Sequence, residues 1–352
     1  MRTRMSGVLF VAALVGLTAG CTQSSVTGGG TADHAGTPRT PWGQPDLQGV
    51  WSPGYYLTPL QRPDKYGERE FLTDEEIAAL EKEQDDTKGR DTRLEQGSRE
   101  DLEGAYNDAF SGRGDKVIRT KRTSLIIDPK DGKVPPLTAA AKARGEERRA
   151  RAEATGRLDP RFAKVGYLVP PPDGGYYSDG PEDRVPDRCL GITLPFLKGT
   201  SGGFTRIAQA PDSVVIYQED GHVGGAFRTV YVDGRTHQPP NVRLWLGDSI
   251  GRWEGDTLVV DTTNFTDRTD FQGSGENLHL VERFTRTGAD MIKYEVTAED
   301  PTTWGRPWTI ELPLTKYDDS QIYESACHEG NYAMTSMLAG ARARERNAGG
   351  AR

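Results

Sequence analysis

The chain has 352 residues, of which 35% are hydrophobic and 27% charged, and its formal net charge is −8 at pH 7. A chain of this length can bury one large hydrophobic core or two smaller ones. The acidic balance argues against nucleic acid and anionic lipid as partners, because both are bound through clustered lysines and arginines.

The first twenty residues have the pattern of a signal peptide. Arg2 and Arg4 precede an apolar run from Val8 to Leu17, which is too short to cross a bilayer core of about 30 Å. The small residues before Cys21 resemble a bacterial lipoprotein box. We expect residues 1–20 to be removed and Cys21 to carry a lipid, with cleavage nearby and release as the alternative. The mature protein would then be a periplasmic or outer-membrane lipoprotein or a secreted protein, touching a membrane only through this anchor.

The next part of the chain is predicted to be a tether followed by a helical segment. Residues 21–40 are rich in Ser, Thr, Gly and Ala and have no apolar period, which is typical of a flexible tether. Residues 41–202 are expected to form a helical, loop-rich segment that packs on the core. Thr73 and Glu76 form a capping box, and a second helix is expected from Thr138.

From Phe204 the sequence consists of short alternating segments separated by turns such as Asp-Gly. This spacing is typical of an antiparallel sandwich or barrel. "DLQGVW" also contains Gly49 and Trp51, a G-x-W that resembles the first strand of lipocalins, where the Trp packs against the barrel end. We therefore expect a mainly β fold with an antiparallel, calycin-like β-barrel over residues 203–330, and a sandwich is the alternative. Residues 331–352 are expected to form a closing helix and tail.

The cysteines predict a disulfide. If Cys21 carries a lipid, Cys189 and Cys327 remain, and disulfides persist in the oxidising cell envelope. We expect them to pair with each other. A thiolate zinc site is disfavoured, because neither has a second cysteine two to four residues away.

Two short motifs resemble known catalytic motifs. "GDSIG" around Ser249 matches the G-x-S-x-G nucleophile elbow, but it is followed by a tight turn between two strands where the elbow requires a helix. "CHEGNY" at His328 lacks the second histidine of the metalloprotease motif. No Walker loop or dinucleotide fingerprint is present, so no organic cofactor is predicted, while a divalent metal stays open.

Strand alternation predicts two unusual charges. It places Glu282 among the core residues of one strand and Arg228 on the apolar face of another. A lone buried charge is costly, so each group must be paired or must line a cavity. A structural Arg228–Glu282 pair and a functional pair at a barrel mouth both remain open.

Histidine is the side chain most often used for proton transfer near neutral pH, and four of the five histidines fall in the strand-rich half. In the catalytic hypothesis, His328 or His222 is the general acid or base, Glu282 is its partner, and Arg228 stabilises a developing anion. The alternative is that each histidine is an ordinary surface or core residue. The candidate ligand-binding residues are Trp245, Trp304, His279 and Arg283.

Several longer phrases carry a resemblance, among them "PWGQPDLQGVWS", "WLGDSIGRWEGDTLVVDTTNF", "ENLHLVERFTR" and "YESACHEGNY". Together they resemble a group of secreted proteins of soil and environmental bacteria, and the match covers nearly the whole chain from Trp42. The resemblance implies export and one intact architecture, and it implies no catalytic residue.

Two functions therefore stay open from the sequence. One is an exported envelope protein with a small-molecule or glycan pocket that acts as a hydrolase or lyase through His and Glu. The other is a non-catalytic lipoprotein that binds a ligand or has a structural role.

Overall fold

The computed structural model describes residues 37–52, 56–86, 116–154, 189, 193–197, 204–219, 225–317 and 326–349. Their contacts belong to one unit, Gly36–Arg352. The expected signal peptide, Cys21, most of the tether and His222 lie outside the described residues.

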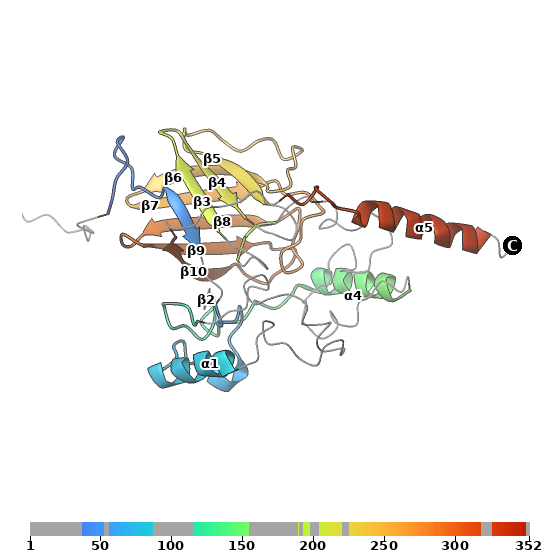
Figure 1. Cartoon of the computed structure of the whole chain (residues 1–352), viewed down its shortest axis with the longest axis horizontal. Coiled ribbons are helices and arrows are strands. Elements are labelled where there is room, and N and C mark those ends of the chain that lie inside the picture. Colours follow the sequence, from blue (N-terminus) through green and yellow to red (C-terminus); the bar gives the residue numbers. More distant parts are fainter. Residues whose placement is uncertain are drawn as a thin grey trace, which may run out of the picture. The chain divides into compact units, whose positions relative to one another are not determined.

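Among the described strands, nine form a closed ring, so the predicted mainly β fold with a barrel is confirmed (Figure 1). β1 pairs with both β3 and β10, and these two pairings close the ring. β2 (Ile126–Asp128) adds to the edge of β10 beside β1. In ring order the nine strands are β1 (Gly49–Ser52), β3 (Thr205–Gln209), β4 (Ser213–Gln218), β5 (Ala226–Tyr231), β6 (Asp248–Glu254), β7 (Thr257–Thr263), β8 (His279–Arg286), β9 (Met291–Glu299) and β10 (Trp308–Lys316).

One junction of the described barrel departs from the expected antiparallel pattern. β5 and β6 are parallel, with Tyr231 opposite Ile250, whereas the other pairs are antiparallel. A parallel pair needs a long crossover, which residues 232–247 supply. A Cβ at Gly251 would lie 2.7 Å from Cγ1 of Val230, so the close packing of β5 on β6 depends on a glycine there. The barrel is therefore mixed.

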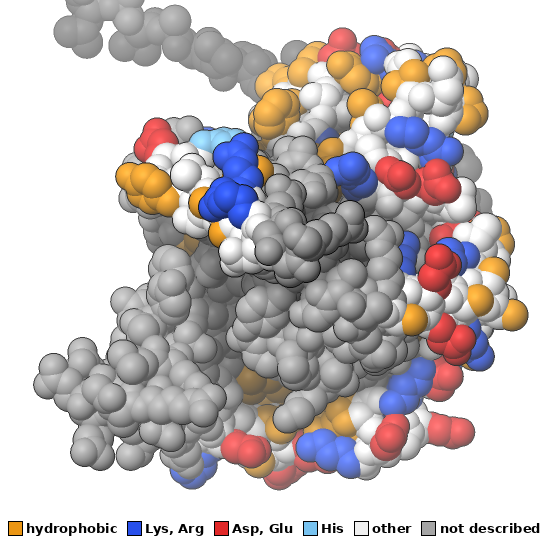
Figure 2. Space-filling model, turned by 90° about the vertical axis from the view of Figure 1, so that its right-hand side faces the viewer, with side chains coloured by type: hydrophobic (Ala, Val, Ile, Leu, Met, Phe, Trp, Pro, Cys, Tyr) orange, Lys and Arg blue, Asp and Glu red, His pale blue; other side chains and the backbone are white. Residues whose placement is uncertain are grey.

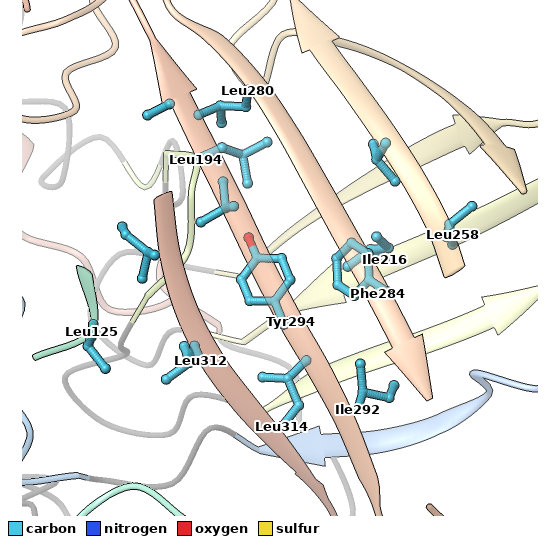
Figure 3. Close-up of a cluster of buried hydrophobic side chains, with 14 of the residues drawn as sticks. Leu125, Leu194, Ile216, Leu258, Leu280, Phe284, Ile292, Tyr294, Leu312 and Leu314 are labelled. Carbon is cyan, nitrogen blue, oxygen red and sulfur yellow. The ribbon is translucent and has the colours of Figure 1, made fainter. Parts of the chain in front are cut away.

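Side-chain alternation builds the core. In β8 and β9 every second residue is buried, as expected for strands with one face inside a barrel. Figure 3 shows side chains from neighbouring strands pointing into this interior, joined by Leu125 and Leu194 from outside the ring. Burying each large aliphatic side chain contributes about 1.5–3 kcal/mol.

The G-x-W strand closes the barrel. Trp51 of β1 is fully buried and its Nε1 donates to the carbonyl of Leu47 at 2.8 Å. The Arg286 guanidinium lies 5.4 Å from the centre of the Trp51 ring. The closing strand therefore comes from the segment expected to pack outside the β domain, far ahead of β3 in the sequence.

The helices begin where the sequence predicts. α1 (Asp74–Asp86) starts after a reciprocal capping box, in which the Thr73 N–H donates to Glu76 Oε2 at 2.9 Å and the Glu76 N–H donates to Thr73 Oγ1 at 3.2 Å. The other described helices are the short 3-10 helix η1 (Asp64–Tyr66), α4 (Ala139–Ala154) and α5 (Ala333–Gly349). No helix in the described ranges is long and apolar enough to span a bilayer.

The predicted disulfide is confirmed. Cys189 and Cys327 are bonded, with 5.7 Å between their Cα atoms and a sequence separation of 138. The Asn331 side-chain amide donates to Cys189 Sγ at 3.2 Å. The bond ties the start of the last described segment to residue 189.

Acidic and basic side chains are interspersed over the described part of the face that Figure 2 shows. Exposed ion pairs among the described residues include Lys121 with Asp74 at 2.6 Å and Arg306 with Asp128 at 2.6 Å. Such exposed pairs contribute at most about 1 kcal/mol each.

Candidate functional site

The interior of the barrel contains a row of polar side chains, one from each of five consecutive strands. Alternation points all of them inward, and each is at most 6% exposed. We call this group the polar belt. Its members are Arg228 of β5, Ser249 of β6, Thr262 of β7, Glu282 of β8 and Tyr294 of β9.

Arg228 and Glu282 are paired in the belt. Arg228 Nη2 donates to Glu282 Oε1 at 2.7 Å, and Nη1 lies 2.7 Å from Oε2. Nη1 also donates to the hydroxyls of Ser249 at 3.2 Å and Thr262 at 3.3 Å. The Tyr294 hydroxyl donates to Glu282 Oε1 at 2.8 Å. The two charges predicted from alternation therefore neutralise each other, with three hydroxyls around them.

The surroundings of the polar belt determine the protonation states of Arg228 and Tyr294. Burial lowers the pKa of Arg228, but the charge and hydrogen bond of Glu282 outweigh burial, and the pKa is raised overall. Burial, helped by the Glu282 charge, raises the pKa of Tyr294 well above its ordinary value. Arg228 therefore stays a cation and the Tyr294 hydroxyl stays a hydrogen-bond donor.

Two atoms of the belt are buried without a hydrogen bond to any described residue. They are Arg228 Nε and Glu282 Oε2. Oε2 is within ion-pair distance of Nη1, but the contact is not aligned as a hydrogen bond. A buried polar group left without a partner costs about 1–3 kcal/mol, and such groups are normally satisfied by protein, water or ligand. The belt can therefore donate to, and accept from, one more molecule.

The wall opposite the belt is apolar. β10, β1 and β3 lie across the ring from β6 and β7. They turn Leu312, Trp51 and Ile207 inward, each at most 2% exposed. The interior is therefore amphipathic, with hydrogen-bonding groups on one side and hydrocarbon and aromatic groups on the other.

The predicted acid–base pair is not assembled among the described residues. His328 is exposed, in the turn that follows Cys327, and its carbonyl accepts from the Asn331 N–H at 3.3 Å. Glu282 is fully buried and bonded to Arg228 and Tyr294. His222, the other candidate, lies outside the described residues.

The predicted ligand-binding residues lie in four separate places. Trp304 is only 1% exposed and packs edge-on against Trp308, with 5.4 Å between ring centres, so it is a core residue and offers no stacking surface. Trp245 is half-buried in the crossover 232–247. Arg283 is on the outer face of β8, paired with Glu254 at 3.0 Å. The fourth residue, His279, belongs to a second cluster.

That cluster lies on the outer face of β6 to β9, and we call it the histidine–carboxylate chain. Asp261 Oδ1 is at its centre, 3.0 Å from His237 Nε2 and 3.1 Å from His279 Nε2. His237 Nδ1 lies 2.9 Å from Asp248 Oδ2, and His279 Nδ1 lies 3.5 Å from Glu299 Oε2. Carboxylates and imidazoles therefore alternate across four strands and the crossover.

Charge pairing shifts the pKa values of two members of the chain. The hydrogen bond to Asp261 is the main cause of the raised pKa of His279. Burial raises the pKa of Asp261, but the two imidazoles together lower it by more. Within the described ranges, no group of three or more His, Cys, Asp or Glu side chains is arranged to hold a metal ion.

Sequence reasoning did not find His237 or its two acidic partners. Asp248, Asp261 and His279 occupy outward positions on three neighbouring strands, which alternation alone could have shown. Their alignment depends on register, with Ile250 opposite Asp261 and Asp261 opposite Val281.

Comparison with known proteins shows no family for this chain. No family model matches the sequence, and no curated protein matches it.

Proposed function

We propose that this protein is a ligand-binding barrel of the cell envelope that holds a small, largely apolar molecule against the polar belt. The observation that carries the proposal is the buried Arg228 Nε, which has no hydrogen-bond partner among the described residues. It faces the interior of a closed nine-strand ring.

The size of the ring supports the proposal. A barrel of about eight strands has an interior that side chains fill or that holds one small ligand, and the diameter grows with strand number. A ring of nine strands is wider than that.

The charge of the belt limits the chemistry of the ligand. Glu282 already neutralises Arg228, so a second buried anion would lie close to the Glu282 carboxylate without a free cation. A neutral acceptor, such as a carbonyl, an ether or a hydroxyl group, would instead bind the Arg228 Nε–H. A hydroxyl of a small molecule or of a sugar also meets this requirement. The apolar wall favours a ligand that is mostly hydrocarbon or aromatic.

Binding is favoured over catalysis because Glu282 is held by two partners and is not paired with a histidine in the described structure. A general acid or base must reach the proton that it transfers. The hydrolase or lyase hypothesis would need a histidine in contact with the belt.

The test combines native mass spectrometry with a fluorescent probe. The chain, exported with its own leader and purified without detergent, is examined for a bound organic mass. It is then titrated with prodan, a neutral naphthalene ketone whose emission shifts to the blue in apolar surroundings. We expect a bound mass or saturable prodan binding. A bare protein that also fails to bind prodan would contradict the proposal.

Matched variants test whether prodan binds at the polar belt. Arg228→Met combined with Glu282→Met removes the buried pair without leaving a lone charge, and it should weaken prodan binding about 10-fold, the value of one hydrogen bond to a charged group. Arg283→Met combined with Glu254→Met removes an exposed pair that also involves β8, and binding should be unchanged. Equal loss in both variants would argue against the belt as the site.

A further inference from the structure

A histidine helps to hold the crossover 232–247 to the barrel, beside the Asn264 side-chain amide, which donates to the Gln238 carbonyl at 2.9 Å. Because β5 and β6 are parallel, the crossover must return along the outside of the barrel before β6 can begin. His237 extends from it to Asp248 of β6 at 2.9 Å and to Asp261 of β7 at 3.0 Å. The neighbouring Gln238 N–H donates to the same Asp248 oxygen at 2.8 Å. One side chain thus joins the crossover to two strands.

With Asp248 and Asp261 both ionised, donation at both contacts requires a doubly protonated imidazole. A neutral imidazole has one N–H donor and one lone pair. His237 has a carboxylate oxygen against each ring nitrogen. In the neutral form, one nitrogen lone pair would therefore face a carboxylate oxygen, and that contact would become repulsive.

The other charged groups around His237 are engaged with partners of their own. On the crossover, Arg235 pairs with Asp233 at 2.6 Å. Arg243 donates to the backbone carbonyls of Phe265 and Glu276. Both arginines therefore make their contacts away from the two acids that hold His237.

The strands β8 and β9 contribute one further imidazole and one further acid to the histidine–carboxylate chain. His279 of β8 shares Asp261 with His237, and Glu299 of β9 lies beside His279. Among the described residues, the cations in ion-pair contact with Asp248 and Asp261 are the two imidazoles. Neutral imidazoles would leave the acids of β6 to β9 without a positive charge between them.

We propose that His237 is a proton-dependent latch, which fastens the crossover 232–247 to β6 and β7 when the imidazole is a cation and loosens this attachment when the imidazole is neutral. The latch rests on the outer face of the barrel and does not depend on a ligand inside it.

The pH window follows from the two shifted members of the chain. The pKa of His279 is raised in the folded protein. Its contribution to the stability of the fold is therefore complete below its unfolded pKa of about 6.5 and is lost as pH rises through its folded pKa. The pKa of Asp261 is lowered in the folded protein. Its contribution to the stability of the fold is therefore present above its unfolded pKa of about 3.9 and is lost as pH falls through its folded pKa. The ion pair of His279 with Asp261, the acid that also holds His237, is therefore complete in mildly acidic solution and is lost in alkaline solution.

Hydrogen–deuterium exchange of the full chain tests the latch. Protection of the peptides that cover 233–247 is measured between pH 5.5 and 9 and corrected for the intrinsic rate. The N–H groups of Gln238 and Leu244 are the reporters, because they donate to Asp248 Oδ2 and to the Asn264 carbonyl at 2.8 and 2.9 Å. We expect at least a fivefold loss of protection across this range, with β9 peptides unchanged. A flat wild-type profile would overturn the proposal, whether or not any variant folds.

A substitution assigns the effect to His237. His237→Gln should show low protection at every pH, because the amide carries no titrating charge. His328→Gln changes an exposed histidine that does not belong to the histidine–carboxylate chain. This variant should keep the wild-type dependence of protection on pH. If His237→Gln retained the pH-dependent loss, the latch would not be His237.

Discussion

Arg228 reaches Glu282 across two intervening strands, and their nitrogen and oxygen atoms meet at 2.7 Å inside the barrel. The guanidinium passes the short side chains of Ser249 and Thr262, which leave it room and accept from it. Five strands are thereby joined by one buried network, and the strength of such a network depends on every member having its partner.

The first prediction concerns the buried pair. Arg228→Met alone should lower the free energy of unfolding by about 3–5 kcal/mol, because it leaves Glu282 buried and unpaired. Arg228→Met combined with Glu282→Met should recover most of that loss, since hydrophobic replacement of a buried pair is close to neutral. Urea unfolding followed by circular dichroism measures both. A single variant that costs less than about 1 kcal/mol would mean that the pair is open to water.

The Tyr294 hydroxyl gives a second prediction. Tyr294→Phe removes the donor to Glu282 Oε1 and should cost about 1.5–3 kcal/mol, as expected for a hydrogen bond to a charged group. Tyr332 is 77% exposed, so Tyr332→Phe is the control and should leave urea unfolding unchanged. Equal stability of the two variants would contradict the geometry of the belt.

A third prediction concerns Asp300, a buried carboxylate that connects two loops at one end of the barrel. It accepts from the hydroxyls of Ser274, Thr302 and Thr303 at 2.6 to 2.7 Å and from the Thr302 N–H at 2.8 Å. Asp300→Ala should cost about 3 kcal/mol, because the buried hydroxyls of Ser274 and Thr303 lose their acceptor. Asp300→Asn should cost less, since its amide oxygen still accepts.

The pKa of Asp300 also predicts that the stability of the protein depends on pH. Burial raises the pKa of Asp300, but its hydrogen bonds together lower it by more. A lowered folded pKa contributes stability above the unfolded value of about 3.9, and that contribution is lost as pH falls through the folded value. The stability advantage of the wild type over Asp300→Asn should therefore shrink in acid. An advantage that is constant from pH 7 to pH 3 would show that the carboxylate is not held as an anion.

The fourth prediction concerns the disulfide. Cys189→Ser combined with Cys327→Ser should lower the free energy of unfolding by about 2–5 kcal/mol, because the bond closes a long loop in the unfolded chain. Dithiothreitol should lower the Tm of the wild type and leave that of the double variant unchanged. Cys21→Ser is the matched control and should keep the wild-type Tm. A wild-type Tm that dithiothreitol does not change would argue that the bond adds no stability.

Alternation made much of the barrel predictable from the sequence. Burial in β8 and β9 follows a period of two, and the same alternation, applied to the sequences of β5 and β8, placed Arg228 and Glu282 inside before their contact was known. The capping box at Thr73 was equally local, because both of its residues lie within one helical turn.

What the sequence did not predict depends on long-range register. Pairing of β1 with β10 brings Trp51 opposite Lys316, and no local pattern specifies that partner. The parallel junction of β5 and β6 was hidden in the same way, because Asp248–Glu254 has the composition of an ordinary hairpin strand. The partners of His237 depend on that junction, so the latch could not be inferred before the fold.

The most direct test of the central claim is an NMR measurement of the arginine Nε–H signals during a prodan titration, with Arg228 assigned from its absence in the Arg228→Met/Glu282→Met variant. If the ligand binds at the polar belt, the Arg228 Nε–H signal should shift in proportion to occupancy, and that of Arg62, which donates to Thr123 at 3.0 Å, should stay in place. Saturable prodan binding with an unmoved Arg228 signal would contradict the account and place the site elsewhere on the protein.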